Sequence, residues 1–270
     1  MVQVSMAVLT AGILSVCTAR SGDPATSTRS LDSLLERGDL AFRKFDNAAA
    51  LEFYQAAYAA DSNSFPVLVR LTRTRNDNGR LLLRVTRDSS EMWYEAALAC
   101  AERLHALYPD SADSNLLLAL CKGSLIPFYG IRDKIRCGKE VEDLASRAVA
   151  IDSSFAPAYV VLGIFWRQAA NLSWLEKTFV RMFFGTDLNG TLEDAERSLK
   201  HALAIEPQNL FAHFELAIVY RDSEKIDKAR EQLQMVLGRA PQSARESMQQ
   251  GEAEKFLARL AGQNSGQKGD

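Results

Sequence analysis

The residues that carry most enzyme chemistry are few and scattered in this sequence. The three histidines, His105, His201 and His213, belong to no H-E-x-x-H pattern or other set with metal-ligand spacing. The phosphate-binding patterns G-x-x-x-x-G-K-[ST] and G-x-G-x-x-G and the nucleophile pattern G-x-S-x-G are also missing from the sequence. The carboxylates of residues 140–144 fall on the polar face of a predicted helix. We therefore predict no catalytic, cofactor or metal site, and a protein that is not an enzyme.

The four cysteines show neither C-x-x-C spacing nor a paired histidine, which argues against zinc and thioredoxin-like redox sites. Cys100 and Cys121 lie within apolar helical patterns, where a thiol usually behaves as a small buried hydrophobe. A disulfide framework is therefore not expected. Cys17 has a different setting, because it follows an N-terminal apolar run.

Residues 1–20 have the pattern of a targeting segment. The apolar run from Met6 to Val16 is too short to span a bilayer comfortably, and it resembles the core of a signal peptide. The stretch LSVC resembles a bacterial lipobox with Cys17 as the lipidated residue, although no basic residue precedes the run. We expect an exported, membrane-associated protein, which would be a periplasmic or outer-membrane lipoprotein if the source is bacterial. An uncleaved N-terminal membrane anchor and an artefact of the start site are the alternatives.

The composition is that of an ordinary globular protein. The 270 residues are 47% hydrophobic and 24% charged, with a formal net charge of −2, so no overall basic charge indicates nucleic-acid binding. Seven prolines and 15 glycines are few for this length, which favours long uninterrupted helices.

Internal periodicity predicts the fold. Five stretches, AADSN, LYPDS, AIDSS, AIEPQ and RAPQS, each end an amphipathic helix that carries small residues at fixed offsets. Another helix precedes each of them, with a small residue where two helices must approach closely, as at Ala119, Gly163 and Ala217. This arrangement resembles the tetratricopeptide repeat, a helix–turn–helix unit of about 34 residues. We predict an all-α superhelix of five such units.

Composition marks the two ends of this repeat domain. The stretch SGDPATSTRS, residues 21–30, reads as a flexible tether. The repeat domain is expected over residues 31–261, and the polar residues 262–270 are expected to form a disordered tail.

Three units are longer than the repeat period. The extra residues lie around NDNGRLLLRVTRDSS, SLIPFYGIRDKIRCG and NLSWLEKTFVRMFFGTDLNG. In the last stretch Ser173 and Glu176 form an S-x-x-E capping box, which predicts an extra helix from Trp174, and TLED (191–194) begins the next helix. The extra helix is expected to add core or cover a groove edge. Contact of its aromatic residues with a membrane or a ligand is the alternative.

A second resemblance lies in the third and fourth units. It is carried by GIRDKIRCGKEVEDLASRAVAIDSS, by AYVVLGIFWRQAA, and by LSWLE followed by an apolar helix and FG. These stretches closely resemble the family called regulator of microtubule dynamics, and the likeness extends over roughly residues 94–260. Members of that family are associated with microtubules and membranes. The resemblance implies a protein–protein adaptor, without the microtubule role if the source is bacterial.

Tetratricopeptide superhelices line their concave groove with the first helix of each unit. Carried onto this chain, the groove positions predict a mainly apolar binding site with arginines at its edge. Its members are Val69, Arg73, Asn76, Leu116, Leu120, Val160, Ile164, Arg167, Phe211, Phe214, Ile218 and Arg221. An exposed apolar groove of this extent indicates a ligand, unless the insertions fold into the groove and fill it.

Two stretches are locally basic in a slightly acidic chain. Residues 70–87 carry six arginines against one aspartate, and residues 122–139 carry five basic residues against one aspartate. Such segments suit phosphates or an acidic protein surface. Pairing of these side chains with acids elsewhere in the chain is the alternative.

These observations favour a binding protein. The first hypothesis is a protein–protein adaptor that takes a peptide or helix of its partner in the concave groove. The alternative is a carrier or sensor that holds a lipid or another hydrophobic ligand there, in contact with an anionic membrane surface.

Overall fold

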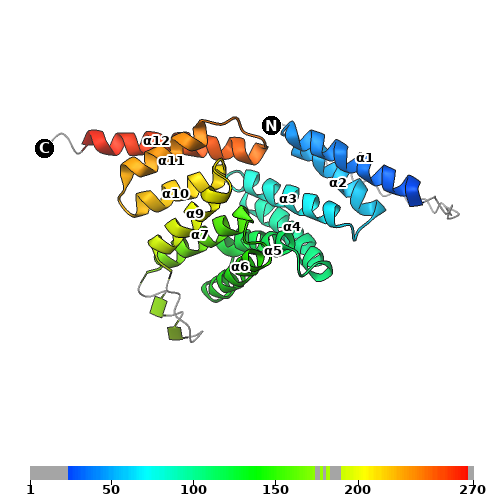
Figure 1. The fold of residues 1–270 in the computed structure, drawn as a ribbon, viewed down its shortest axis with the longest axis horizontal. Coiled ribbons are helices and arrows are strands. Elements are labelled where there is room, and N and C mark those ends of the chain that lie inside the picture. Colours follow the sequence, from blue (N-terminus) through cyan, green and yellow to red (C-terminus); the bar gives the residue numbers. More distant parts are fainter. Residues whose placement is uncertain (1–23, 174–176, 179–180, 183–189, 267–270) are drawn as a thin grey trace, which may run out of the picture.

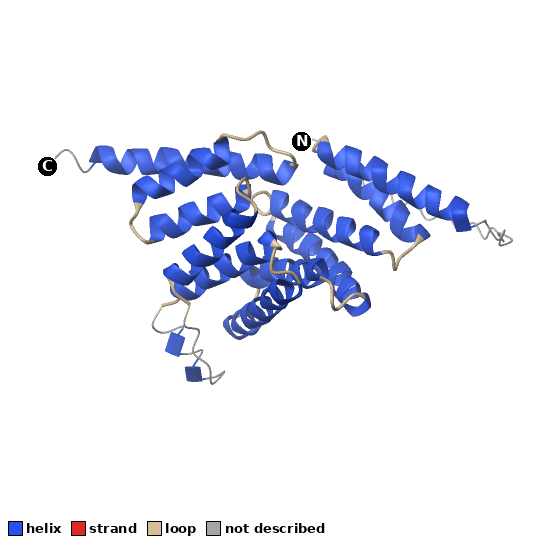
Figure 2. Ribbon diagram, viewed as in Figure 1, coloured by secondary structure: helices blue, strands red, loops and turns tan. Residues whose placement is uncertain are grey.

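The computed structural model describes residues 24–173, 177–178, 181–182 and 190–266, and every regular element within these ranges is a helix (Figure 2). The helices pair in chain order: α1 (Pro24–Arg43) with α2 (Asn47–Ala60), α3 (Phe65–Leu82) with α4 (Arg87–Leu107), α5 (Ala112–Leu125) with α6 (Ile131–Ile151), α7 (Ala156–Ala170) with α9 (Leu192–Ile205), and α10 (Leu210–Asp222) with α11 (Ile226–Leu237). A short 3-10 turn, η1 (Ile126–Phe128), precedes α6, and a last helix, α12 (Ala244–Gly266), follows the fifth pair. The predicted all-α fold of helix-turn-helix units is confirmed.

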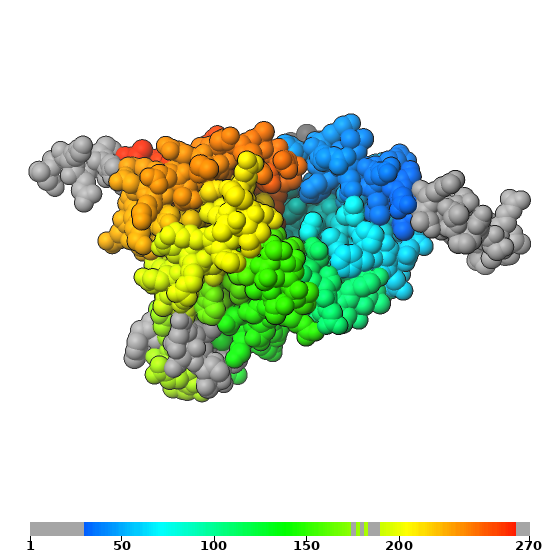
Figure 3. Space-filling model, viewed as in Figure 1, coloured from blue at the N-terminus to red at the C-terminus, as the bar shows by residue number. Residues whose placement is uncertain are grey.

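The pairs stack side by side in an arc (Figure 1). The second helix of each unit also packs on the first helix of the next unit, from α2 on α3 to α9 on α10, and α11 packs on α12. The N-terminal units and the C-terminal helices occupy opposite sides of the middle units (Figure 3). The arc is curved enough that α12 also contacts α3, so the last helix returns to the second unit.

Small residues let the two helices of a unit approach closely. A Cβ added to Gly163 of α7 would lie 2.6 Å from Cγ of Leu199 on α9, and Leu199 has no exposed surface. The same contact recurs in the second unit, where a Cβ at Gly79 would lie 2.6 Å from the ring of Tyr94. The extra residues predicted around Gly79 lengthen α3 and α4, and Gly79 itself lies where the two helices pack against each other.

The helix ends repeat as well. The backbone N–H of Asp61, Asp152 and Glu206, which follow α2, α6 and α9, each donates to the carbonyl four residues earlier at 2.8–3.0 Å. The predicted start at TLED is confirmed, since Thr191 Oγ1 accepts from Asp194 N at 3.1 Å in a full capping box. These local signals fix the boundaries of the repeated helices.

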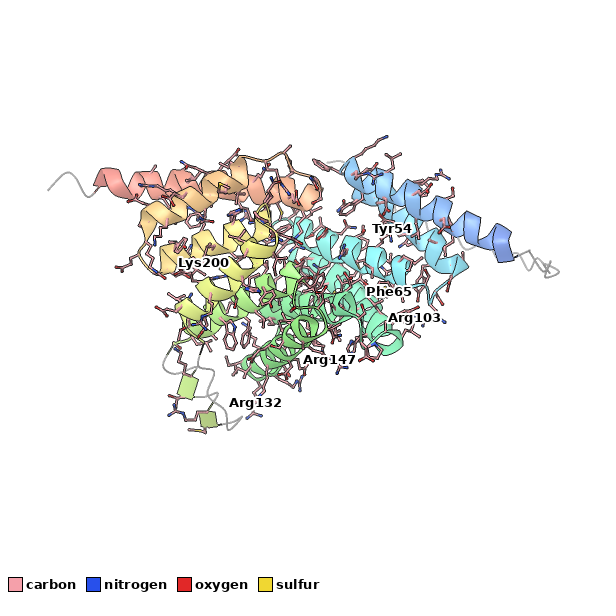
Figure 4. The ribbon with its side chains drawn as sticks, viewed as in Figure 1. Tyr54, Phe65, Arg103, Arg132, Arg147 and Lys200 are labelled. Atoms are coloured by element: carbon pink, nitrogen blue, oxygen red, sulfur yellow. The ribbon has the colours of Figure 1, made fainter. Side chains whose placement is uncertain are left out.

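Two arginines of the second helices, Arg103 and Arg147, which are labelled in Figure 4, each bond to the loop before their unit. Arg103 of α4 donates from Nε to the carbonyl of Ser62 at 3.0 Å, in the loop between α2 and α3. Arg147 of α6 donates to Asp110 at 2.9 Å, in the loop between α4 and α5. Each of these bonds links a unit to the loop that precedes it, which adds order to the stack beyond the apolar core.

Parts of the sequence predictions fall outside the described residues. These parts are the targeting segment 1–20 with Cys17 and most of the extra helix predicted from Trp174. At the domain boundaries, α1 begins at Pro24, within the predicted tether 21–30, and α12 continues to Gly266, within the predicted tail 262–270. Within the described ranges, the helices are all too short or too polar to be candidate membrane spans.

The buried cysteines match the prediction. Cys100 and Cys121 lie in the apolar core as free thiols, and Cys137 is buried and free as well. Burial raises the pKa of the Cys121 thiol far above its usual value, so this thiol is held protonated. These cysteines serve packing in the described part of the chain.

Candidate functional site

A large cavity lies inside the arc, on the side of the first helices. Its volume is about 1320 Å³, and residues of α3, α5, α7, α10 and α12 form most of its wall. The second helices contribute less, mainly through α6. The superhelix therefore positions this site, because each unit presents the inner face of its first helix to the same space.

Most residues predicted for the groove line this cavity. Arg73, Asn76, Leu116, Leu120, Val160, Ile164, Arg167, Phe211, Phe214 and Ile218 are all in its wall, whereas Val69 and Arg221 are not. Val69 is instead buried in a core cluster with Leu68 and Leu104. Arg221 pairs with Asp222 at 2.6 Å and lies over the ring of Phe256. The repeat register thus brings ten of the twelve predicted positions into one cavity wall, while the binding role of these residues remains a prediction.

The apolar part of the wall has two layers. Val160 and Phe214 are 7% and 9% exposed and belong to the packed core, so they form a floor. Ile164 and Ile218 are only partly buried and pack on that core from the cavity side. These two side chains are therefore among the apolar groups that a ligand would cover, together with the partly exposed Phe211.

Arg167 was expected at the edge of the groove, but it is paired with a carboxylate in the cavity wall. Its Nη2 donates to Glu215 Oε2 of α10 at 3.1 Å, and its Nη1 lies 4.0 Å from Asp222 Oδ2. The Arg167 side chain is only 17% exposed. It is thus an ion-paired part of the wall between the fourth and fifth units, and no local sequence pattern indicated its partner Glu215.

The polar side of the cavity was not predicted. Here α12 faces α3 and the turn after it: Arg245 donates to Asp77 at 3.2 Å, and Glu252 lies 3.1 Å from Arg80 and 2.8 Å from Arg84. All five side chains line the cavity. Asp77 and Arg80 lie on α3 and Arg84 lies in the turn after it, and nothing in the sequence placed α12 against them.

The charge of the described wall is mixed with a positive excess. Seven arginine and lysine side chains line the cavity against five carboxylates. Burial raises the pKa of Asp77 and of Glu215 above the usual carboxyl range, although Arg245 and Arg167 favour their charged forms. The excess of cations in a partly enclosed space favours an anionic group on any ligand.

The basic stretch 70–87 is paired within the chain. Arg70 makes two hydrogen bonds to Asp39 at 2.7 and 2.9 Å, and Arg73 contacts Asp113 at 3.0 Å. Arg75 donates to the Ala96 carbonyl, and Arg87 donates to the Pro127 carbonyl. In the second basic stretch Lys122 pairs with Glu140 at 2.7 Å. These contacts favour the alternative of internal pairing over two free basic surfaces.

Each of the three histidines contacts other side chains or the backbone of the repeat. His213 is buried between the Gln232 side chain and the Pro207 carbonyl, at 2.7 and 2.9 Å. His201 packs on the ring of Tyr159, and His105 lies 3.4 Å from the Ser114 hydroxyl. Among the described residues no group of three or more His, Cys, Asp or Glu side chains could hold a metal ion.

Comparison with solved structures supports the fold. A thermophilic TPR protein of Thermus thermophilus matches with a TM-score of 0.61 at 19% identity, over 83% of this chain and 98% of that one. PilF of Pseudomonas aeruginosa matches with a TM-score of 0.52 at 13% identity, over 91% of this chain and 95% of that one. At such identities the likeness concerns the fold alone.

Sequence comparison identifies the family. The chain is 28% identical to regulator of microtubule dynamics protein 3 of Rattus norvegicus over 171 residues, which are 62% of this chain and 36% of the relative. It is 22% identical to protein 1 of Bos taurus over 178 residues, which are 66% of this chain and 55% of the relative. The chain thus spans about a third to a half of the length of these relatives. The family model "Regulator of microtubule dynamics protein 1-3" matches residues 32–261, so the chain belongs to this family.

Proposed function

We propose that this protein is a non-enzymatic adaptor that holds a segment of a protein partner in its concave cavity. The segment would have an apolar face and acidic side chains. The observation that carries the proposal is the cavity itself. The partly buried side chains of Ile164 and Ile218 lie in its wall, and the wall has more cationic than anionic side chains. An apolar surface left open inside a folded domain usually marks a binding site.

The size of the cavity supports a polypeptide segment. Its volume of about 1320 Å³ exceeds the range of about 300–1,000 Å³ that is common for small-molecule pockets. The wall extends over the first helices of the second to fifth units, which suits an extended or helical segment. The relatives are named regulators of microtubule dynamics, and this too favours a protein partner.

The distribution of charge supports an acidic segment. The cations at the wall include Arg84, whose side chain is 64% exposed, and Arg73, which is 52% exposed although it pairs with Asp113. A carboxylate that reaches such a guanidinium forms a charge-assisted hydrogen bond, which is stronger than a neutral one. A partner with basic residues would instead meet these same arginines and be repelled.

A lipid or similar hydrophobic ligand is the second candidate function. The observation that favours it is that Val160, Ile164, Phe214 and Ile218 line the same cavity and pack in one apolar cluster, which would suit an acyl chain beside an arginine-bound headgroup. Native mass spectrometry of protein purified from its own source separates the two candidates. A co-purifying lipid would support the carrier, and its absence with peptide binding retained would support the adaptor.

The test of the adaptor uses two synthetic amphipathic peptides with the same leucine face. The Glu peptide carries glutamates on its other face, and the Lys peptide carries lysines. We expect the Glu peptide to bind in fluorescence anisotropy and the Lys peptide to bind far more weakly. Ile164→Asp should weaken binding of the Glu peptide about tenfold or more. Burial of an Ile side chain contributes about 1.5–3 kcal/mol, and each 1.4 kcal/mol of binding free energy changes the affinity by a factor of about ten.

Met235→Asp is the matched control, because Met235 is 55% exposed on α11 and does not line the cavity. It should leave both the affinity and the melting temperature close to the wild type. Equal affinity for the two peptides, or equal loss in the two variants, would contradict the proposal. If Ile164→Asp unfolds the protein, the position is core and the cavity is not an open binding site.

A further inference from the structure

The last helix, α12, has two different faces. Ala253, Phe256 and Leu260 are buried against α10 and α11, and the rings of Phe214 and Phe256 are 6.4 Å apart. Towards its N-terminal end the helix presents polar residues to the cavity, among them Gln249 and Glu252. The apolar half anchors α12 to the fifth unit, and the polar half crosses to the second unit.

The contact across the cavity is built from ion pairs. Glu252 lies between Arg80, in the last turn of α3, and Arg84, in the turn that follows α3, with its oxygens 3.1 and 2.8 Å from their guanidinium nitrogens. Gln249 donates to the same carboxylate at 3.3 Å. The buried apolar clusters that contain described residues of α3 include none from α12, and the cluster of α12 includes none from α3. The arc is therefore closed here by polar contacts rather than by core.

We propose that Glu252 is an internal stand-in for an acidic side chain of the partner. It occupies the Arg80–Arg84 pair when the cavity is empty, and a carboxylate of the bound segment replaces it there. This inference rests on the proposed adaptor function and adds the regulation of the same site. The C-terminal helix thus acts as a clasp that competes with the partner.

The exposure of the groups makes this exchange feasible. The Glu252 side chain is 10% exposed, whereas Arg84 is 64% exposed and Arg80 is 35% exposed. A partner carboxylate can therefore reach Arg84 from solvent before Glu252 leaves. The arginines keep a carboxylate partner throughout, so neither guanidinium is left unpaired, and the displaced Glu252 carboxylate turns into solvent, because leaving it unpaired in a partly buried site would be costly. An apolar or basic group of a partner could not replace the Glu252 carboxylate between the two arginines.

Glu252→Gln removes the competing charge and keeps the shape of the side chain. We expect it to tighten binding of the Glu peptide about tenfold, in the same anisotropy titration. A third peptide with glutamines in place of the glutamates should show no such gain. Glu254→Gln is the matched control, since Glu254 lies two residues away on the exposed face of α12 and does not line the cavity.

Arg84→Gln is the second variant, at a position exposed enough to tolerate the change. It should weaken binding of the Glu peptide several-fold and leave binding of the glutamine peptide unchanged, because a carboxylate of the Glu peptide is expected to pair with Arg84. Unchanged binding of the Glu peptide would contradict the exchange even if Glu252→Gln does not fold. If the wild type, Glu252→Gln and Arg84→Gln bind the Glu peptide equally well, the clasp proposal is wrong, while the adaptor proposal is not contradicted. If none of the peptides binds any of these proteins, the adaptor proposal fails and the clasp fails with it.

Discussion

Gly163→Ala tests whether close helix packing defines each repeat. The added Cβ would lie 2.6 Å from Cγ and 2.9 Å from Cδ2 of Leu199, about 1 Å inside the usual separation of about 3.5–4.0 Å between carbon atoms. Leu199 has no exposed surface and sits in the core cluster of the fourth and fifth units, so it has little room to move away. The substitution must therefore separate α7 from α9 or strain the side chain.

Two opposing terms set the magnitude. Alanine in place of glycine inside a helix stabilises by about 0.8–1.0 kcal/mol, and overpacking a core costs about 1–3 kcal/mol. The free energy of unfolding should therefore fall by about 0–2 kcal/mol. Gly251→Ala on α12 is the control, because a Cβ there meets nothing within 4 Å. That variant should gain about 0.8–1.0 kcal/mol from helix propensity alone.

Urea unfolding of the two variants and the wild type, followed by far-ultraviolet circular dichroism, measures both changes. The difference between the variants, about 1–3 kcal/mol, is the overpacking cost itself. Adding Leu199→Ala to Gly163→Ala should remove that cost, so the double-mutant cycle should show coupling between the two positions. If Gly163→Ala stabilises the protein as much as Gly251→Ala does, the close approach of α7 and α9 is wrong.

Two further predictions concern other parts of the chain. Burial opposes ionisation of Asp39, but hydrogen bonds from Arg70 and Tyr54 outweigh it and hold the pKa of Asp39 below its usual value. This contribution to stability is present above about pH 4 and is lost as the pH falls through the lowered pKa, so melting temperatures over that acidic range should fall less in Asp39→Asn than in the wild type. If residues 1–20 direct export as a lipoprotein, intact-mass analysis of the membrane-derived protein should find it beginning at a diacylated Cys17. Cys17→Ser should then release it from membranes, whereas recovery of an uncleaved chain would indicate an anchor.

Local features of the repeat were predictable from the sequence, and long-range pairing was not. Gly163 and the TLED cap act within one unit, and their effect follows from helix geometry at short range. Gly79 makes the same contact as Gly163, yet the extra residues around it obscured the period. The sequence feature that could have revealed this contact is Tyr94, fifteen residues after Gly79. Tyr94 packs against Gly79 as the large side chain of Leu199 packs against Gly163.

The closure of the cavity depends on the curvature of the whole superhelix. Arg80 and Glu252 are 172 positions apart in sequence, and Arg245 and Asp77 are 168 positions apart. Their meeting follows from small rotations between successive units that add up over the arc, and no local pattern records that sum. The groove positions of single helices could thus be predicted, while the helix that crosses the groove could not.

Site-specific photo-crosslinking tests the central claim, which is that a partner segment binds inside the cavity. A photoreactive benzoylphenylalanine replaces Ile218, a half-buried residue of the cavity wall, or Met235, an exposed residue of α11 outside it. Irradiation with the Glu peptide should give a covalent adduct from position 218 and none from position 235. Peptide binding without an adduct at position 218, or with equal adducts at both positions, would contradict the account.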